Sequence, residues 1–201
     1  MFHVKHEGWE VTAALGIQLG SEAEDRLERY ERLLLEKAVP RGMIAASDAS
    51  RLRERHILDS IRAAPLLPAS GTVCDLGSGA GLPGIALAIV RPDLQWVLVE
   101  VRRNRAAFLE EASAGLHNVS VYAGRLETIG ERAAVCTARA FATATRSWEA
   151  ATNVLEPDGS LIYWAGETFQ ASTDLPKGVS ARLFHSSALA RAGALVIMTR
   201  Q

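Results

Sequence analysis

The sequence predicts an α/β protein in which a mostly parallel, doubly wound sheet follows a helical N-terminal extension. Three observations support this fold class. Residues 1–70 show only helical periodicity, residues 72 onward alternate short apolar runs with helical stretches, and a glycine-rich segment joins the first such run to the next helix. We expect a helical cap over residues 1–70 and one compact α/β unit over residues 71–201.

The helical segment is predicted to contain two helices. Residues 21–38 repeat apolar side chains at helical steps, and Ser21 followed by Glu24 has the spacing of a capping box. The break at residues 40–42, Pro-Arg-Gly, ends this helix. A second helix is expected over residues 47–64, before Pro65.

Strands and helices are predicted to alternate in the remaining chain, with right-handed connections between parallel strands. The expected strands are residues 72–76, 95–100, 119–122, 133–137, 161–164, 181–185 and 195–199. The expected helices are residues 85–90, 108–116 and 144–155. The last of these should end at the turn formed by residues 157–159, Pro-Asp-Gly.

Composition excludes several classes of protein. The chain of 201 residues is 48% hydrophobic with a net charge of −1, so a polyanion must meet a local basic patch rather than bulk charge. Cys74 and Cys136 sit in apolar runs and are expected to be core thiols in a reducing compartment. We find no signal-peptide pattern and no apolar span of 18 residues, and therefore expect a cytoplasmic protein.

His3 and His6 alone do not predict a metal site, and no Cys/His spacing does so elsewhere.

The most informative stretch is residues 75–84, Asp-Leu-Gly-Ser-Gly-Ala-Gly-Leu-Pro-Gly. It follows a predicted strand and opens a helix, where free backbone amides favour negative groups. In open α/β sheets, ligands bind beyond the carboxyl ends of the strands at such a loop. The sequence therefore places a ligand site here, against the plainer alternative of a structural turn that binds nothing.

Two ligand classes fit this loop. Gly79-x-Gly81-x-x-Gly84 matches the dinucleotide pattern, which keeps an NAD(P)-dependent oxidoreductase open as an alternative. The glycines at 77, 79 and 81 instead resemble the loop of S-adenosylmethionine-dependent methyltransferases. Glu100, at the end of the next strand, suits a ribose diol in either class. The Asp75 carboxylate would repel a pyrophosphate but suits the cationic groups of S-adenosylmethionine, which favours the methyltransferase.

Several motifs occur in a specific order along the chain. They are Arg55-His-Ile-Leu-Asp-Ser60, the glycine loop, Arg91-Pro92, Gly124-Arg-Leu-Glu127 and Ala138-Arg-Ala-Phe-Ala142. Together they resemble the small-subunit ribosomal RNA methyltransferase G family, also called glucose-inhibited division protein B. The resemblance runs from about Tyr30 to the C-terminus.

The resemblance implies a Rossmann-like S-adenosylmethionine-dependent methyltransferase that methylates guanine N7 in the decoding-region loop of 16S rRNA. Its partner would be 16S rRNA or the small ribosomal subunit, and we expect a monomer without membrane or metal. The family's cofactor contacts correspond to Gly77, Leu82, Leu126, Glu127 and Arg139. Together with the loop and strand-end positions, the expected cofactor-binding residues are Asp75, Gly77, Ser78, Gly79, Leu82, Glu100, Leu126, Glu127 and Arg139.

The sequence departs from the family pattern in three places. Residues 38–44 replace the usual Trp-Asn and Asn-Leu-Thr, Ala138 replaces a Ser, and Ala165-Gly166 replaces Lys-Gly. The last change removes a positive charge near the expected pocket. It leaves open a second alternative, a non-catalytic ribosome-binding module.

Guanine N7 has an available lone pair, so the reaction needs no general base, and we name no catalytic base. Arg139 is expected to orient the cofactor or the substrate, or else to be a surface arginine paired with Glu127 or Glu100. His56 and Asp59, three residues apart, form either a site pair or a packing pair. In that pair Asp59 could raise the proton affinity of His56.

Two arginine-rich groups are candidates for contacts with RNA phosphates, or else are solvated faces. Binding through them should weaken with salt. The candidate RNA-binding residues are Arg51, Arg55, His56, Arg62, Arg102 and Arg103, with Arg53 and Arg105 as neighbours.

Overall fold

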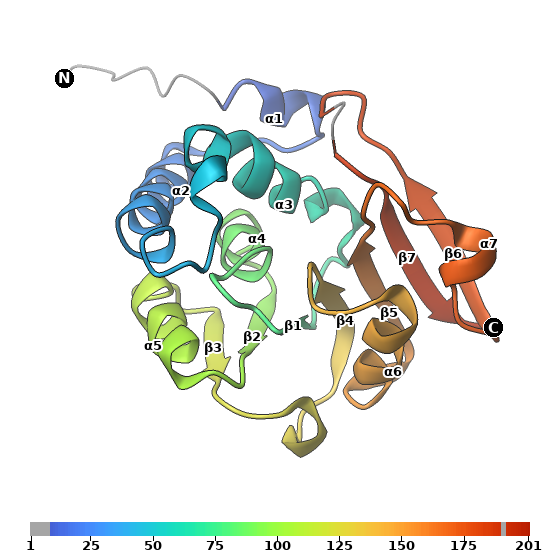
Figure 1. Cartoon of the computed structure of the whole chain (residues 1–201). Helices are drawn as coiled ribbons and strands as arrows, with labels where there is room; N and C mark the ends of the chain where they lie inside the picture. Colours follow the sequence, from blue (N-terminus) through green and yellow to red (C-terminus); the bar gives the residue numbers. More distant parts are fainter. Residues whose placement is uncertain (1–8, 190–191) are drawn as a thin grey trace.

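The computed structural model describes residues 9–189 and 192–201, which form a seven-stranded sheet with helices on both faces (Figure 1). The strand order is β3-β2-β1-β4-β5-β7-β6. The strands are β1 (Thr72–Leu76), β2 (Gln95–Val99), β3 (Val119–Tyr122), β4 (Ala133–Ala138), β5 (Leu155–Trp164), β6 (Val179–Phe184) and β7 (Leu195–Arg200). Strands β1 to β5 pair in parallel, and β7 runs antiparallel to both β5 and β6. The predicted mostly parallel, doubly wound sheet is confirmed.

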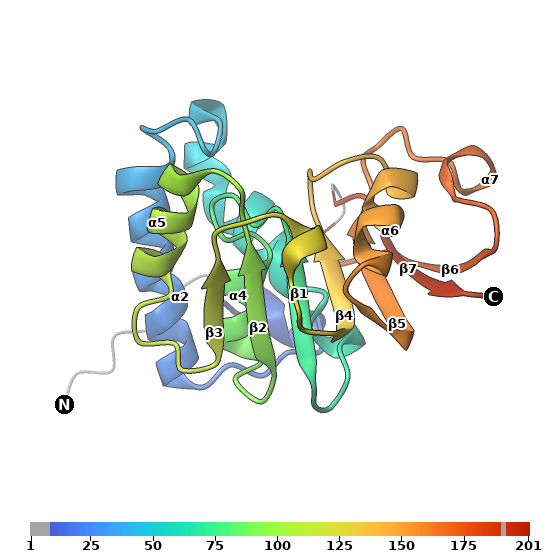
Figure 2. The same ribbon diagram turned by 90° about the horizontal axis from the view of Figure 1, so that it is seen from below.

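The sheet separates two apolar cores because successive strand residues point to opposite faces. Val73 and Trp96 belong to the core on one face, whereas Cys74 and Cys136 belong to the core on the other. Figures 1 and 2 show α6 on the face opposite α4 and α2. The α-helices are α1 (Val11–Ala14), α2 (Ser21–Leu33), α3 (Asp59–Ile61), α4 (Gly84–Val90), α5 (Arg103–Ala112), α6 (Ala144–Thr152) and α7 (Ala171–Asp174).

The helical N-terminal segment packs into the first of these cores. Leu27 of α2 and Ile61 of α3 are fully buried there together with Ile85 of α4. The boundary at residue 70 stays a prediction from sequence, since the segments before and after it share this core.

The two predicted N-terminal helices are less regular than their periodicity suggests. Helix α2 continues into a wide π-type turn, η1 (Leu34–Ala38). The second predicted helix is a succession of η2 (Ala46–Arg51), η3 (Arg53–Leu58) and α3, followed by the short η4 (Ala64–Leu66). Because 3₁₀ and π turns rotate the chain differently from an α-helix, residues 47–64 do not share the faces that one continuous α-helix would give them.

The predicted capping box is wrong. Helix α2 begins at Ser21 with Gly20 as its N-cap, and the Glu24 amide donates to the Gly20 carbonyl. The Ser21 hydroxyl makes no capping bond because Ser21 already lies inside the first turn.

The helix predicted over residues 144–155 is too long. Helix α6 ends at Thr152, and Leu155 begins β5, where it pairs with Ala133 of β4. The Pro-Asp-Gly segment at 157–159 lies inside β5, where the register against β4 shifts. A bulge tolerates Pro157, which has no amide to donate, so these residues interrupt strand pairing instead of ending a helix.

The two cysteines lie in the core, as predicted. Cys74 and Cys136 are buried free thiols, aligned as partners on β1 and β4. Residues 9–189 and 192–201 contain no helix with the length and apolar character needed to cross a bilayer. His3 and His6 lie outside the described residues, and inside them no group of three metal-ligating side chains occurs.

Candidate active site

The glycine loop occupies the carboxyl end of β1, as predicted, and leads directly into α4. Gly77, Gly79 and Gly81 all have positive φ angles, of 63°, 58° and 88°. At Gly77 a Cβ atom would lie 2.6 Å from Cδ2 of Phe141. A side chain here would be strained by the backbone conformation and would collide with the ring in its present position.

Asp75 holds the loop from beneath. Its side chain is fully buried, with Oδ1 accepting a hydrogen bond from the Thr137 hydroxyl at 2.6 Å and Oδ2 accepting from the Gly84 amide at 3.3 Å. Burial raises the pKa of Asp75 to about 6, although these hydrogen bonds act in the opposite direction. Both carboxylate oxygens are engaged inside the protein, so Asp75 holds the loop in place, and its direct contact with a cofactor stays a prediction.

Glu100 lies at the carboxyl end of β2, next to the same loop. One carboxylate oxygen accepts from the Gly79 amide at 3.1 Å and the other from the Arg102 amide at 2.8 Å. Arg105 places a guanidinium nitrogen 3.9 Å from this carboxylate. Glu100 thus lies at the end of β2, where the sequence predicts it, and its contact with a ribose stays a prediction.

Tyr30 is a positioning residue that sequence reasoning missed. Its hydroxyl donates a hydrogen bond of 2.7 Å to the carbonyl of Ala80 in the glycine loop. Burial raises the pKa of Tyr30 well above its usual value, so the hydroxyl keeps its proton. The residue fits the apolar stripe of α2 so well that nothing in the sequence marks its polar end as functional.

A first cavity, of about 250 Å³, opens along the glycine loop. Five of the predicted cofactor-binding residues line it: Gly77, Ser78, Gly79, Leu82 and Arg139. The other lining residues are Met43, Ile44, Ala45, His56, Ala80, Arg105 and Ala140. The structure therefore brings most of the predicted loop residues together with the end of β4.

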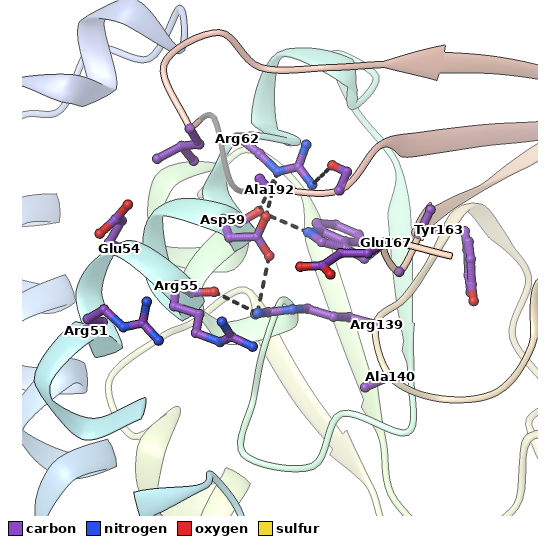
Figure 3. A pocket seen from close by; sticks show the side chains of 15 residues that line it. Arg51, Glu54, Arg55, Asp59, Arg62, Arg139, Ala140, Tyr163, Glu167 and Ala192 are labelled. Carbon is purple, nitrogen blue, oxygen red and sulfur yellow. Dashed lines mark hydrogen bonds and ion pairs between the residues drawn. The ribbon is translucent and has the colours of Figure 1, made fainter. Parts of the chain in front are cut away.

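A second cavity, of about 470 Å³, shares Arg139 and Ala140 with the first (Figure 3). Its charged lining consists of Arg51, Glu54, Arg55, Asp59, Arg62, Arg139 and Glu167. Its other walls are Tyr163, Trp164, Ala165, Gly166, Leu189, Ala192 and Gly193. Ala165 and Gly166, which replace the family's Lys-Gly, thus line a cavity next to the glycine loop.

Arg139 ties the end of β4 to the helical segment. Its guanidinium lies 3.2 Å from Asp59 Oδ2 and donates to the Arg55 carbonyl at 2.8 Å (Figure 3). It also donates to the Ser60 hydroxyl at 3.1 Å. The alternative pairing with Glu127 or Glu100 is wrong, because β4 ends beneath η3 and α3. Burial lowers the pKa of Arg139, and Asp59 counteracts this.

Asp59 is the common partner of two arginines. Its carboxylate pairs with Arg62 at 2.8 Å as well as with Arg139, and its backbone carbonyl accepts from the Trp164 indole at 2.9 Å. The predicted pair between His56 and Asp59 is wrong. His56 Nε2 instead lies 3.1 Å from Asp48 Oδ2. The expected rise in proton affinity is also wrong, because burial and the neighbouring Arg139 lower the pKa of His56.

Leu126 and Glu127 lie in η5 (Leu126–Thr128), beyond the carboxyl end of β3. The Leu126 side chain is buried in the second core, and Glu127 is exposed. Neither residue lines the two cavities described above. Their contact with a cofactor stays a prediction, and Leu126 can contribute through its backbone without leaving the core.

The predicted RNA-binding arginines differ in availability. Arg51 and Arg55 line the second cavity with exposed side chains, and Arg102 and Arg103 are exposed at the start of α5. Arg62 is buried, donating to Asp59 and to the Gly193 carbonyl at 2.8 Å, so its guanidinium is already satisfied. The neighbouring Arg53 is likewise occupied, by Glu31 and by the ring of Trp9.

The strand order, the single antiparallel strand β7 and the glycine loop after β1 define a Rossmann-like fold of the methyltransferase type. The solved structure of a tRNA m1G37 methyltransferase from M. jannaschii shares this fold with a TM-score of 0.54 at 14% identity, covering 71% of this chain and 48% of that one.

Residues 23–180 match the family described as rRNA small subunit methyltransferase G, and the chain belongs to this family. A relative of that name from Acidothermus cellulolyticus is 44% identical over 69% of this chain. Another, from Mycobacterium leprae, is 38% identical over 83% of this chain and 76% of its own length. The matched region spans 63% of the Acidothermus protein, a little under two thirds of its length.

Proposed function

We propose that this protein binds S-adenosylmethionine in the first cavity and transfers its methyl group to N7 of a guanine in 16S rRNA. The observation that carries the proposal is the shared wall: Arg139 and Ala140 line both the glycine-loop cavity and the larger cavity beside it. A methyl donor and an acceptor base need adjoining sites of this kind. The family's curated relatives, named for small-subunit rRNA methylation, support the same activity.

The first cavity suits the cofactor because Gly77, Ser78 and Gly79 of the glycine loop line it. Gly77 and Gly79 carry no side chain, so a ligand can approach their backbone closely. Glu100 accepts one hydrogen bond on each carboxylate oxygen, from the Gly79 and Arg102 amides, and its remaining lone pairs can accept from a ribose diol. S-adenosylmethionine supplies an activated methyl group, and the chain's residues need only hold donor and acceptor in line.

The second cavity suits a nucleotide turned out of its RNA strand. Tyr163, Trp164 and Leu189 give it apolar surface, while Arg51 and Arg55 bring exposed cations to its rim. Aromatic and apolar walls accommodate a base, and arginines contact the phosphates on either side of it. Because N7 already carries a lone pair, this chemistry needs no general base.

The test is methyl incorporation from labelled S-adenosylmethionine into small-subunit rRNA from cells that lack this modification. Three substrate forms are tested: naked RNA, an assembly intermediate and the complete subunit. We expect at least one of them to accept one methyl group per 16S rRNA, at guanine N7. The absence of incorporation into all three would overturn the proposal.

Calorimetry separates the two alternative functions. If the protein binds NAD(P) and does not bind S-adenosylhomocysteine, an oxidoreductase is favoured; only the glycine spacing supports that alternative. If it binds ribosomal particles and does not bind S-adenosylhomocysteine, a non-catalytic module is favoured; Ala165 in place of Lys supports that alternative. We further propose that the protein acts as a cytoplasmic monomer, which light scattering of the purified chain and cell fractionation test.

A further inference from the structure

Arg139, which lines both cavities, is the first of three hydrogen-bonded side chains that come from three separate segments. Arg139 Nη2 lies 3.2 Å from His56 Nδ1, and His56 Nε2 lies 3.1 Å from Asp48 Oδ2. Arg139 follows β4, His56 belongs to η3 and Asp48 to η2. All three side chains are mostly buried, with 16% of Arg139, 15% of His56 and 16% of Asp48 exposed.

The direction of both hydrogen bonds follows from the chemistry of the outer groups. A guanidinium can only donate, so His56 Nδ1 must accept with a free lone pair. An ionised carboxylate can only accept, so Nε2 must carry the hydrogen. His56 is thereby fixed as the neutral Nε2–H tautomer, and the lone pair that Arg139 meets exists only while Nε2 keeps this proton.

We propose that Asp48 is a positioning residue for Arg139, acting through His56. By accepting the Nε2 hydrogen, Asp48 fixes the tautomer and ring orientation of His56, and so fixes where the guanidinium lies on the shared wall. The inference rests on the proposed function, because the consequence of a displaced guanidinium is slower methyl transfer.

The other contacts of these groups set the size of the effect. The Arg139 guanidinium also has Asp59 and the Arg55 carbonyl as partners, so it stays near the wall when His56 no longer accepts. Asp48 has a second partner too, the Arg55 side chain at 3.3 Å. We therefore expect the Arg139 guanidinium to become misaligned but to remain in the site. Because Asp48 has two partners, the experiment must separate its hydrogen bond to His56 from its charge, which faces Arg55.

The first experiment compares Asp48→Ala with Asp48→Asn. The amide oxygen of Asn still accepts from Nε2–H but carries no charge for Arg55. Asp48→Ala should lower kcat for methyl transfer to 16S rRNA about tenfold with little change in KM for S-adenosylmethionine, since a small misalignment slows an in-line transfer strongly. Asp48→Asn should stay within about threefold of the unaltered protein.

Two results would overturn the inference. Equal losses in both variants would show that the charge facing Arg55 matters and the hydrogen bond to His56 does not. Unchanged kcat in both would show that Asp48 plays no part. Asp93→Asn is the matched control, because it removes an exposed carboxylate paired with Arg91, outside both cavities.

A second pair of variants tests the middle of the chain. His56→Asn can place an amide oxygen near the position of Nδ1, whereas His56→Leu offers no acceptor. We expect His56→Asn to keep more activity than His56→Leu. Adding Asp48→Ala to His56→Asn should then cost nothing further, because the tautomer no longer has to be fixed. A full additional tenfold loss in the double variant would contradict the relay.

The tautomer itself can be observed without any activity. In protein labelled with ¹⁵N in its imidazoles, the His56 signals, assigned by their absence in His56→Asn, should show a protonated Nε2 and a bare Nδ1. Asp48→Ala should convert them to a mixture of tautomers. A protonated Nδ1 in the unaltered protein would overturn the relay, whereas failure to bind S-adenosylhomocysteine would overturn the proposed function and leave this result standing.

Discussion

The hydroxyl of Tyr30 donates to the carbonyl of Ala80 at 2.7 Å, joining the first long helix to the glycine loop across fifty residues of chain. Both groups are buried, at 3% and 6% exposure. The bond makes the helical extension part of the cofactor site, because the loop's conformation is held from α2 above as well as from Asp75 beneath. Figure 1 shows α2 alongside α4, the helix into which the loop leads.

Tyr30→Phe should therefore weaken the loop without emptying the core. The change leaves the Ala80 carbonyl without its partner and should lower the free energy of unfolding by about 1–2 kcal/mol. S-adenosylhomocysteine should bind several-fold more weakly, measured by calorimetry beside urea unfolding. Ser120→Ala, which removes another hydroxyl-to-carbonyl bond on β3, is the control and should leave cofactor affinity unchanged. Unaltered affinity in Tyr30→Phe would remove Tyr30 from the site.

Gly77→Val should abolish cofactor binding while the fold persists. The new side chain meets the Phe141 ring and must adopt a φ near 63°, which costs an ordinary residue about 1–2 kcal/mol and a β-branched one more. The ring is partly exposed and can move, so unfolding is not expected.

Gly178→Val is the matched control for this change. Gly178 has a φ of 72° and no atom within 4 Å of a built Cβ, so it carries the backbone strain without the collision. It should lose stability and retain cofactor affinity. Normal affinity in Gly77→Val would show that the loop assignment is incorrect.

Because of Asp75, the free energy of unfolding should decrease as the pH rises from 4 to 6. Its pKa is about 6 in the folded chain, above the ordinary value of 3.8, because burial disfavours the charge. The folded state therefore holds the proton more tightly than the unfolded state. The stabilising contribution is complete below pH 4, declines as pH rises and is lost above pH 6, by about 3 kcal/mol in total.

Urea unfolding at several pH values, with Asp75→Asn as the variant, measures this contribution. The decline should flatten in Asp75→Asn. The control, Asp93→Asn, removes a carboxylate whose pKa is lowered by Arg91, so its contribution has the opposite sign, present at neutral pH and lost on acidification. An identical slope in Asp75→Asn and the unaltered protein would contradict the assignment.

The exposed arginines of the two predicted RNA-binding groups should control the salt dependence of RNA binding. Each phosphate contact contributes about 0.7–0.9 to the slope of log affinity against log salt concentration. Arg51→Ala and Arg103→Ala should each reduce the slope by about that amount, measured by anisotropy with a 16S rRNA fragment. Arg200→Ala is the control, because antiparallel β7 carries Arg200 toward the amino end of β5, away from the carboxyl ends of the strands where the cavities lie. A slope unaffected by Arg51→Ala and Arg103→Ala would indicate a solvated face.

The sequence by itself determined the alternation of strands and helices, the position of the glycine loop and the acid at the end of β2. These features depend on local periodicity and on residues that only a tight loop requires, so they can be read from neighbouring positions. The family motifs added the assignment of Arg139 to the site, although not its partners.

Only the tertiary structure decided which groups meet. Asp75 turns inward because β1 pairs with β4, which carries its partner Thr137. The bond of His56 to Asp48, the pairing of Arg139 with Asp59 and the burial of Arg62 depend on how η2, η3 and α3 pack over the ends of β1 and β4. The bulge at residues 157–159 likewise follows from pairing between β4 and β5. Side-chain partners from segments far apart leave no periodic trace in the chain, because their meeting is set by packing and not by sequence separation.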